Sequence, residues 1–592
     1  MKKFNIYNKV KAMSKGFLPF YLFILLPLMT SCLDLDPQDQ LAETNLWKTP
    51  SEYKLFANQF YSWTRHFQSA TQNDQRKPWH SDYMSDLMTS KENRNIYSNG
   101  TNTVPESDSN YGTAYQHIRR CNLLLKNAAE FASPNDIAQY VGEAYFFRAY
   151  SYFDLLQFYG DAIITEKPLD TSSPELYVAR NDRSEVADFI IHDLQEAIQL
   201  LPAFKELSGY SRVSREAAQA FLSRVALYEG TWQENRGNTA RGTQLLDIAA
   251  KAAREVIDSK AFSIFAPESL GEKAQKYMFV LEDVRCTPDA SLKKIDNHEY
   301  IFARCYDEVL DNIGWNISQS FLLNACWVTR KMANMYLCQN GLPIEYGGTK
   351  NPQFKGYNQM DDEFQNRDNR MRYTMAKPHD AFWGNTNPRV NWTGDDADLK
   401  NALTTNFIPT TGTGYHNQKW ATERKVDSGN EGYDFPIIRY AEVLLNYAEA
   451  VFERDGRISD EDLNRSLNLV RRRVNPDMPL LSNKLINDYP GMDMRTEIRR
   501  ERTVELYNEG FRLDDLKRWK TAETEMPQDL LGIKWEGTEY QTTWAKCSYQ
   551  RNAEGCIVME TGRQWKERNY LFPLPKDELQ LNPNLKQNPG WE

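Results

Sequence analysis

The sequence predicts a mainly α-helical protein, because apolar residues recur at helical spacing over long stretches and strand-like alternation is scarce and short. Helix starts support the same fold class. Ser214 is a suitable N-cap, since the good helix formers Ala217 and Ala218 follow it. A second start lies at residues 459–462, where a serine precedes acidic residues that suit the positive end of a helix dipole.

The helical periodicity occupies two parts of the chain. Helices of these lengths owe most of their stability to packing of an apolar face, so we expect them to pack on one another. In chain order the predicted helices are Pro50–Phe67, Tyr111–Phe131, Asn135–Tyr159, Arg183–Leu201, Ser214–Gln233, Thr239–Ser259, Asp434–Glu453, Ser459–Val474 and Arg495–Trp519.

A local pattern recurs in three of these helices. Each has a glutamate beside an alanine near its start and a glycine at its end, in residues 143–160, 216–230 and 441–456. The first two lie about two periods apart, taking the roughly 34-residue period of tetratricopeptide repeats. We expect tetratricopeptide-like helix pairs that stack into an α-solenoid; antiparallel helices without a true repeat are the alternative.

The N-terminal residues have the pattern of an export signal. Residues 1–31 carry five lysines and no acid, and an apolar run at 17–29 ends in Met-Thr-Ser before Cys32. That run is about thirteen residues, short of the roughly 20 needed to span a bilayer as a helix. We predict a signal peptide at 1–31, an acylated Cys32 as lipid anchor and a tether over 32–46. Ordinary secretion with a buried cysteine is the alternative.

The charge of the chain limits its partners. The formal charge is −10, and removal of residues 1–31 with their five lysines makes it −15. An acidic surface argues against nucleic acid and anionic lipid as partners. No Pro/Ser/Gly-rich or single-sign linker divides residues 47–592, so we expect one large body.

That body divides into regular and irregular regions. Helical repeats are predicted mainly at 47–260 and 434–520. The region 262–433 and the tail 521–592 are rich in Asn, Gly, Asp, Pro and Trp, and predict loops, short helices and small strands. We expect the ligand side in 262–433, because rigid scaffolds display recognition groups on loops. Asn-Pro turns near the C-terminus are expected to hold the tail against the body.

Cysteine and histidine patterns predict neither a metal nor a cofactor. Seven cysteines besides Cys32 cannot all pair, and Cys547–Cys556 is the one disulfide that their spacing suggests. No two histidines lie three or four residues apart, and no zincin, nucleophile-elbow or phosphate-loop motif occurs.

Carboxylates are interpreted as structural. We interpret those at 361–363 and 395–396 as solvated turns, so no catalytic residue is predicted. Opposite charges three residues apart, at 497/500, 502/505 and 509/512, predict ion pairs on one helix.

Aromatic residues beside polar ones are the best candidates for ligand contact. A sugar ring needs a flat aromatic face and neighbouring Asp, Asn or Arg groups for its hydroxyls. For each tryptophan a role in the core is the alternative. The predicted ligand-binding residues are Trp79, Asp82, Tyr83, Trp315, Asn316, Trp327, Arg330 and Trp383.

Several segments, in order along the whole chain, resemble the signatures of the SusD/RagB family. They begin with YQHIRRCN at 115–122, GEAYFFRA at 142–149 and FYGD at 158–161. RYAEVLLNYAEA at 439–450 and the RRER and EGFR runs within 499–512 follow, and LNPNL and QNPGW at 581–591 complete the set. One such motif would be weak, but this many in order are specific.

The resemblance implies a SusD-like α-solenoid body that is not an enzyme. It implies a lipoprotein on the outer membrane, facing the cell exterior, that captures oligosaccharide for a SusC-like TonB-dependent transporter. Peptide cargo is the alternative within the family, and a surface glycoside hydrolase is the alternative outside it. The motif residues themselves are expected to form scaffold.

Overall fold

The structure, a computed structural model, describes residues 46–67, 81–89, 95–287, 291–314, 317–319, 327–376, 381–384, 387–391, 412–422, 429–543 and 549–592. These residues form a mainly helical body to which small two-stranded antiparallel sheets are attached. The predicted mainly α-helical class is confirmed, and the tetratricopeptide-like repeat stays a prediction. Cys32 and the predicted signal peptide and tether up to residue 45 lie outside the described residues.

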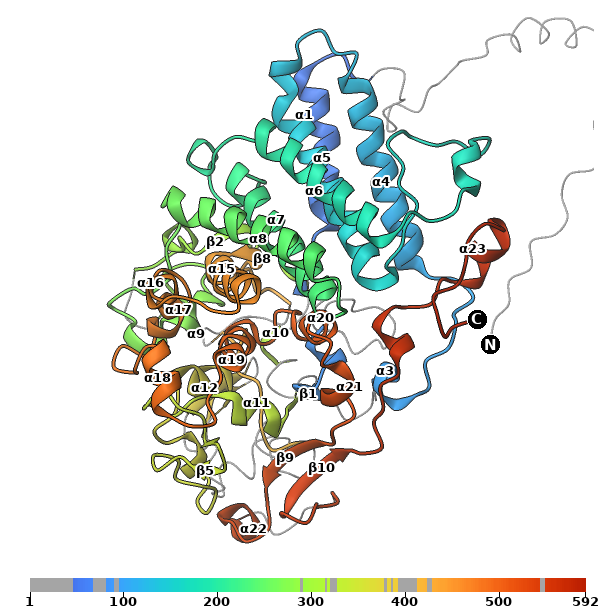
Figure 1. Cartoon of the computed structure of the whole chain (residues 1–592). Helices are drawn as coiled ribbons and strands as arrows, with labels where there is room; N and C mark the ends of the chain where they lie inside the picture. The colour runs from blue at the N-terminus through green and yellow to red at the C-terminus, as the bar shows by residue number, and fades with distance from the viewer. Residues whose placement is uncertain are drawn as a thin grey trace, which may run out of the picture.

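The N-terminal half is a row of long helices in which each packs on the next along the chain (Figure 1). A later helix returns to pack against α7 and α8. Most predicted helices in this half are confirmed to within three residues at each end. The row consists of α1 (Pro50–Asn58), α4 (Ser109–Ala128), α5 (Pro134–Tyr159), α6 (Arg183–Leu200), α7 (Arg215–Glu234) and α8 (Thr239–Ser259), and the returning helix is α15 (Tyr440–Asp455).

Local sequence explains where these helices start and how closely they pack. Ser214 caps α7, because its hydroxyl accepts a hydrogen bond from the Ala217 amide at 3.1 Å, as predicted. Asp182 caps α6 in the same way. Gly230 lets α7 and α8 approach closely, since a Cβ there would lie 3.0 Å from the Leu246 side chain.

Three predicted helices are shorter than expected. The helix predicted at Pro50–Phe67 is α1 followed by a 3₁₀ turn, η2 (Gln59–Trp63). The helix predicted from Asp434 begins instead with a buried strand, β8 (Phe435–Arg439), and becomes helical at Tyr440. Ser459–Val474 is broken at Ser466, where φ and ψ are −133° and −103°.

The helix predicted at Arg495–Trp519 is also two helices. The first is α19 (Met494–Leu506) and the second is α20 (Arg512–Arg518). Between them Asn508 and Gly510 adopt φ of 58° and 81°, in the left-handed region that a right-handed helix cannot contain. The chain therefore turns where periodicity alone predicted continuity.

Short helices and small sheets form much of the described part of 262–433 and 521–592, and others lie in the regions where helical repeats were predicted. The sheets pair β1 (Met88–Thr89) with β3 (Trp327–Val328), β2 (Tyr300–Arg304) with β8, β4 (Glu345–Tyr346) with β5 (Thr349–Lys350), β6 (Ala381–Gly384) with β7 (Asn387–Asn391), and β9 (Leu530–Lys534) with β10 (Cys556–Glu560). The short α-helices are α3 (Ile96–Asn99), α9 (Ala274–Met278), α10 (Ile317–Gln319), α11 (Arg330–Met335), α12 (Asn369–Thr374), α16 (Asp460–Arg465), α17 (Leu467–Arg472), α18 (Asn483–Asp488), α21 (Ala522–Glu525), α22 (Glu539–Thr543) and α23 (Lys576–Leu581).

The C-terminal tail returns to the N-terminal helices, and Figure 1 shows α23 beside α4. The Asn588 amide donates to the carbonyl oxygens of Tyr159 and Phe572 at 3.0 and 2.6 Å. The Asn582 amide donates to the Val178 carbonyl oxygen at 2.9 Å. The prediction that the tail is held against the body is confirmed.

The suggested disulfide is wrong. Cys556 lies in β10 as a free, buried thiol. Its possible partner, Cys547, lies outside the described residues.

A buried ionic network joins segments that are far apart in the sequence. The Glu505 carboxylate accepts hydrogen bonds from Arg439 and Arg473 at 2.7 Å each and from Arg370 at 3.1 Å. Glu299 bridges Arg439 and Arg473 from the other side, at 2.8 and 2.7 Å. Burial alone would raise the pKa of Glu505, but the three guanidinium groups lower it well below its usual range.

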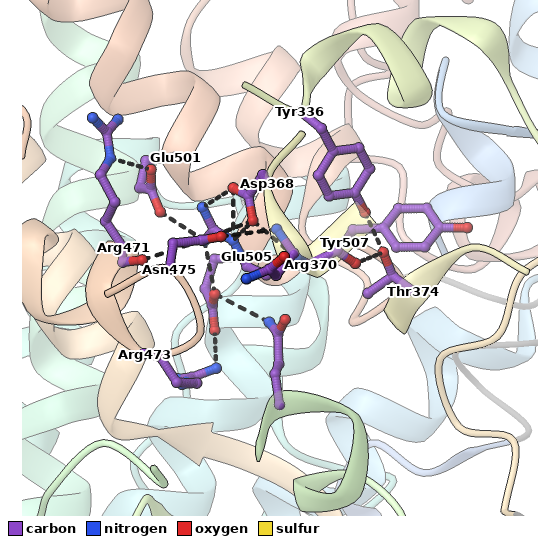
Figure 2. Close-up of polar contacts among 12 residues, drawn as sticks. Tyr336, Asp368, Arg370, Thr374, Arg471, Arg473, Asn475, Glu501, Glu505 and Tyr507 are labelled. Carbon is purple, nitrogen blue, oxygen red and sulfur yellow. Dashed lines mark hydrogen bonds and ion pairs between the residues drawn. The ribbon is translucent and has the colours of Figure 1, made fainter. Parts of the chain in front are cut away.

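The network continues from Arg370, as Figure 2 shows. Arg370 also pairs with Asp368 at 2.7 Å and with Glu501 at 2.6 Å. Glu501 in turn accepts a hydrogen bond from Arg471, and Asn475 donates to Asp368. These groups are buried, so each charge is balanced by the opposite charges of its neighbours and not by solvent.

The predicted local ion pairs are confirmed at one position. Glu497 and Arg500 pair at 3.1 Å on α19. Arg502 instead pairs with Asp515 of α20 at 2.9 Å, and Glu505 binds the arginines of the network.

The pair predicted at 509/512 is wrong because α19 ends before it. Glu509 binds Lys419 at 2.6 Å and Arg439 at 2.7 Å. Arg512 pairs with Asp86 at 2.9 Å. The scaffold interpretation holds, but most partners are tertiary.

Replacement of Glu505 by glutamine should strongly destabilise the protein. The change removes a negative charge that three buried arginines share, and breaking a buried ion pair costs about 3–5 kcal/mol of unfolding free energy. Urea unfolding followed by circular dichroism measures this loss. The matched control is Lys484→Gln, which removes a charge from an exposed pair with Asp488 and should leave the midpoint unchanged. Equal midpoints for both variants would contradict the structural role of Glu505.

A second buried pair should make stability depend on pH. Arg518 binds Glu449 at 2.6 Å; burial opposes ionisation, but Arg518 and its neighbours lower the Glu449 pKa from 4.5 to about 2. The unfolded chain then binds more protons than the folded one between these values, so the pair stabilises the fold above pH 4.5 and less as pH falls towards 2. The free-energy gap between wild type and Glu449→Gln should therefore shrink below pH 4.5. Urea unfolding at pH 7, 4 and 3 measures the gap, and a constant gap would contradict the assignment.

Candidate functional site

One small sheet brings together two segments that carry predicted ligand-binding residues. β1 follows the segment that carries Asp82 and Tyr83, and Thr89 of β1 pairs with Trp327 of β3. Trp327 also forms a bridge with His416. Segments that are far apart in the sequence thus meet beside α11, which carries Arg330.

The other predicted residues cannot be placed in this arrangement. Trp79, Trp315 and Asn316 lie outside the described residues. Trp383 lies in β6, which pairs with β7, and its side chain is outside the described part. The structure therefore does not test whether these four side chains contact ligand.

Asp82 is buried and binds backbone groups. Its carboxylate accepts hydrogen bonds from the Asn508 amide at 2.5 Å and the Arg512 amide at 3.1 Å. These amides belong to the turn between α19 and α20 and to the first residue of α20, so Asp82 fixes that connection. Burial raises the Asp82 pKa to about 6, although both amides oppose the shift.

Trp327 and Tyr83 are also buried. Trp327 is 3% exposed, and its indole packs so closely on Gly412 that a Cβ there would lie 2.6 Å from the ring. Its Nε1 has no hydrogen-bond partner among the described residues. In this conformation both rings pack inside the loop region, and ligand contact by them stays a prediction.

Arg330 belongs to a cluster of sugar-binding residue types that the sequence did not reveal. Its guanidinium lies 4.1 Å from the centre of the Tyr357 ring. Next to it the Tyr415 hydroxyl donates to Glu363 at 2.8 Å. We call Arg330, Tyr357, Glu363 and Tyr415 the Arg330 cluster.

The electrostatics of the Arg330 cluster differ from the sequence expectation. Glu363 was expected in a solvated turn, but it is only 6% exposed, so that interpretation is wrong. Burial raises its pKa, while Arg330 acts in the opposite direction. Arg330 Nη1 has no hydrogen-bond partner among the described residues. The acidic run at 361–363 was the available sequence signal, and its polar composition concealed the burial.

Two general properties of the described residues bear on function. Within them, no group of three or more His, Cys, Asp or Glu side chains could hold a metal ion. The helices of the described part are all too short or too polar to span a bilayer.

Sequence profiles of two families match the chain. The profile of the SusD family matches residues 298–591, and one described as "Starch-binding associating with outer membrane" matches residues 33–227. Two SusD-like proteins of Formosa agariphila are each 24% identical to it. One alignment covers 85% of this chain and 91% of the relative, and the other covers 82% and 80%.

Solved structures show the same fold. A SusD-like carbohydrate binding protein of Bacteroides fragilis matches with a TM-score of 0.71 at 21% identity, over 91% of this chain and 99% of the other. The surface glycan-binding protein A of Bacteroides fluxus matches with a TM-score of 0.55 at 18% identity, over 92% and 99%. Because the two profiles match both halves of the chain and the fold agrees throughout, this protein belongs to the SusD/RagB family.

Proposed function

We propose that this protein is a cell-surface glycan-binding lipoprotein that captures oligosaccharide and delivers it to a SusC-like TonB-dependent outer-membrane transporter. It binds its cargo and does not cleave it. Family membership over both halves of the chain carries this proposal. The similar carbohydrate binding protein of Bacteroides fragilis and glycan-binding protein of Bacteroides fluxus support glycan as the cargo class.

The proposed glycan site lies beside β1 and β3, which bring the segment that carries Tyr83 next to Trp327. Trp79 and Trp315 are proposed to stack on sugar rings, with Asn316 and Trp383 beside them. The buried Asp82 helps to position this site, because its hydrogen bonds connect the segment before β1 to the α19–α20 turn.

The buried groups near β3 suit the same task. Tyr83, Trp327 and Arg330 are proposed to border the cargo, with Trp327 Nε1 and Arg330 Nη1 as hydrogen-bond donors for sugar hydroxyls. Both donors are buried and lack a partner in the described part of the chain, so a rearrangement that brings a sugar hydroxyl to them would also satisfy them.

Calorimetry should detect glycan binding without turnover. We expect saturable heat when the purified full-length protein in detergent is titrated with plant, microbial and host oligosaccharides, and intact sugars in the same mixtures by chromatography. Stacking on one aromatic ring is worth about 1 kcal/mol, so Trp79→Ala and Trp315→Ala should each weaken binding about fivefold or more.

The control for these variants is Tyr177→Ala, which removes an exposed ring from the turn η4 (Pro174–Tyr177). It should leave oligosaccharide affinity unchanged. Cleavage of the sugars would favour a hydrolase. The absence of binding heat with every oligosaccharide tested would contradict glycan capture by the isolated protein.

The lipid anchor gives a separate prediction. The first helix, α1, starts at Pro50, after the predicted tether over 32–46, so we expect the fold not to depend on the anchor. Cys32→Ala should move the protein from the membrane fraction to the soluble fraction without changing its melting temperature, because several acyl chains supply the membrane affinity. Retention of the variant in washed membranes would refute the anchor assignment.

A further inference from the structure

A groove away from the proposed glycan site lies along one face of α4. Its volume is about 400 Å³, within the range of small-ligand sites. Residues 111, 112, 115, 116 and 119 of α4 form one wall, because positions four apart share a helix face. The loop 163–176 and the C-terminal segment 578–585 form the rest.

The floor of the groove is apolar, and one of its tyrosines is held by a hydrogen bond. Tyr111 is buried, and its ring packs against Tyr115 with centroids 5.1 Å apart. The Tyr115 hydroxyl accepts a hydrogen bond from the Ile163 amide at 2.9 Å. The aliphatic side chains that line the groove are Ile163, Leu169, Leu176 and Leu585.

A glycine keeps the groove open. Gly112 lies inside α4 with ordinary helical geometry, and a Cβ built there would meet no atom within 4 Å. No close packing therefore requires glycine, although glycine stabilises a helix less than alanine does. The space that a side chain would fill belongs to the groove.

Two opposite charges that pair with no charged group among the described residues line the groove. The Arg119 Nε donates to the Leu169 carbonyl oxygen at 3.0 Å, and its two terminal nitrogens bind no other described residue. The Glu578 carboxylate also has no hydrogen bond or ion pair among the described residues, and it lies close enough to Tyr111 to act on its hydroxyl electrostatically. Lys167 and Glu175 on the rim pair with each other at 2.5 Å.

We propose that this groove binds a short peptide with free termini, holding its ammonium group at Glu578 and its carboxylate at Arg119. Tyr111 and Arg119 are eight residues apart on α4, which is about 12 Å along the axis. Three or four extended residues span about the same length, at roughly 3.3–3.6 Å each. The apolar floor takes an apolar side chain of the peptide.

The charges distinguish this occupant from others. An anionic ligand would meet Glu578 at one end, and a cationic ligand would meet Arg119 at the other. A neutral sugar would leave both charges without a counter-charge. A zwitterion satisfies both, and its carboxylate can bind the two free guanidinium nitrogens together.

The test pairs each end of the peptide with one end of the groove. The probe is alanyl-leucyl-alanine, titrated by calorimetry into the full-length protein in detergent. Acetylation of its N-terminus should weaken binding roughly tenfold in the wild type and have no effect in Glu578→Gln. Amidation of its C-terminus should weaken binding by a similar factor in the wild type and have no effect in Arg119→Gln.

Gly112 supplies the blocking variant and its control. Gly112→Trp should fill the groove and abolish peptide binding without unfolding the chain, because nothing contacts a Cβ at that position. Gly112→Ala should keep peptide binding and raise the melting temperature. Both variants should leave oligosaccharide binding unchanged. A failure of the peptide proposal can therefore be distinguished from a failure of the proposed glycan function.

Three results would overturn the proposal. The first is no binding of the tripeptide at millimolar concentration. The second is tripeptide binding that survives Gly112→Trp, which would place the peptide elsewhere. The third is loss of oligosaccharide binding in Gly112→Trp, which would make the groove a sugar site.

Discussion

The compensation of buried charge around Glu505 is the constraint on which the architecture depends. Glu505 lies on α19, and its three arginine partners come from β8, from the end of α17 and from α12. A buried charge without its partners costs several kcal/mol, so each segment is needed by the others. The network thus joins the elements of residues 434–520 to the loop-rich region 262–433 in a way that apolar packing alone, which is non-directional, would not specify.

The same network reaches the loops of the proposed glycan site through the turn after α19. Lys419 binds the Glu509 carboxylate at 2.6 Å, and the Trp420 indole donates to the Asn508 carbonyl oxygen at 3.1 Å. From the opposite direction Asp82 accepts the Asn508 amide. One turn therefore holds the segment before β1 and the segment after His416 in place. Irregular backbone can present ligand groups reproducibly because a rigid scaffold holds it.

Periodicity predicted the long helices well and failed where a short local feature interrupted it. Residues 435–438 are a buried run that leads directly into α15, so strand and helix share one apolar pattern. The break between α19 and α20 depends on residues with left-handed backbone angles, which the spacing of apolar residues does not reveal.

Tertiary contacts account for what the sequence could not give about the candidate site. In sequence, a tryptophan near an arginine fits either the core or a surface for sugar stacking. In the structure Gly412, far along the chain, packs against the Trp327 indole and buries it. Tyr357 and Tyr415 lie in stretches without periodicity, so only the fold brings them to Arg330. The family motifs, in contrast, are short contiguous segments that can be recognised without the fold, and they predicted the family correctly.

The attachment of the tail has a consequence for the order of folding. The bond from Asn588 to the Tyr159 carbonyl oxygen joins residues 429 positions apart. The carbonyl oxygen at the end of α5 is bound by Asn588, so the hydrogen bonding of this early helix is completed only after residue 588 has been synthesised. Contacts of such sequence separation form slowly, because loop closure costs entropy before the contact compensates for it. The final hydrogen bonding at the end of α5 thus depends on residues more than 400 positions later in the sequence.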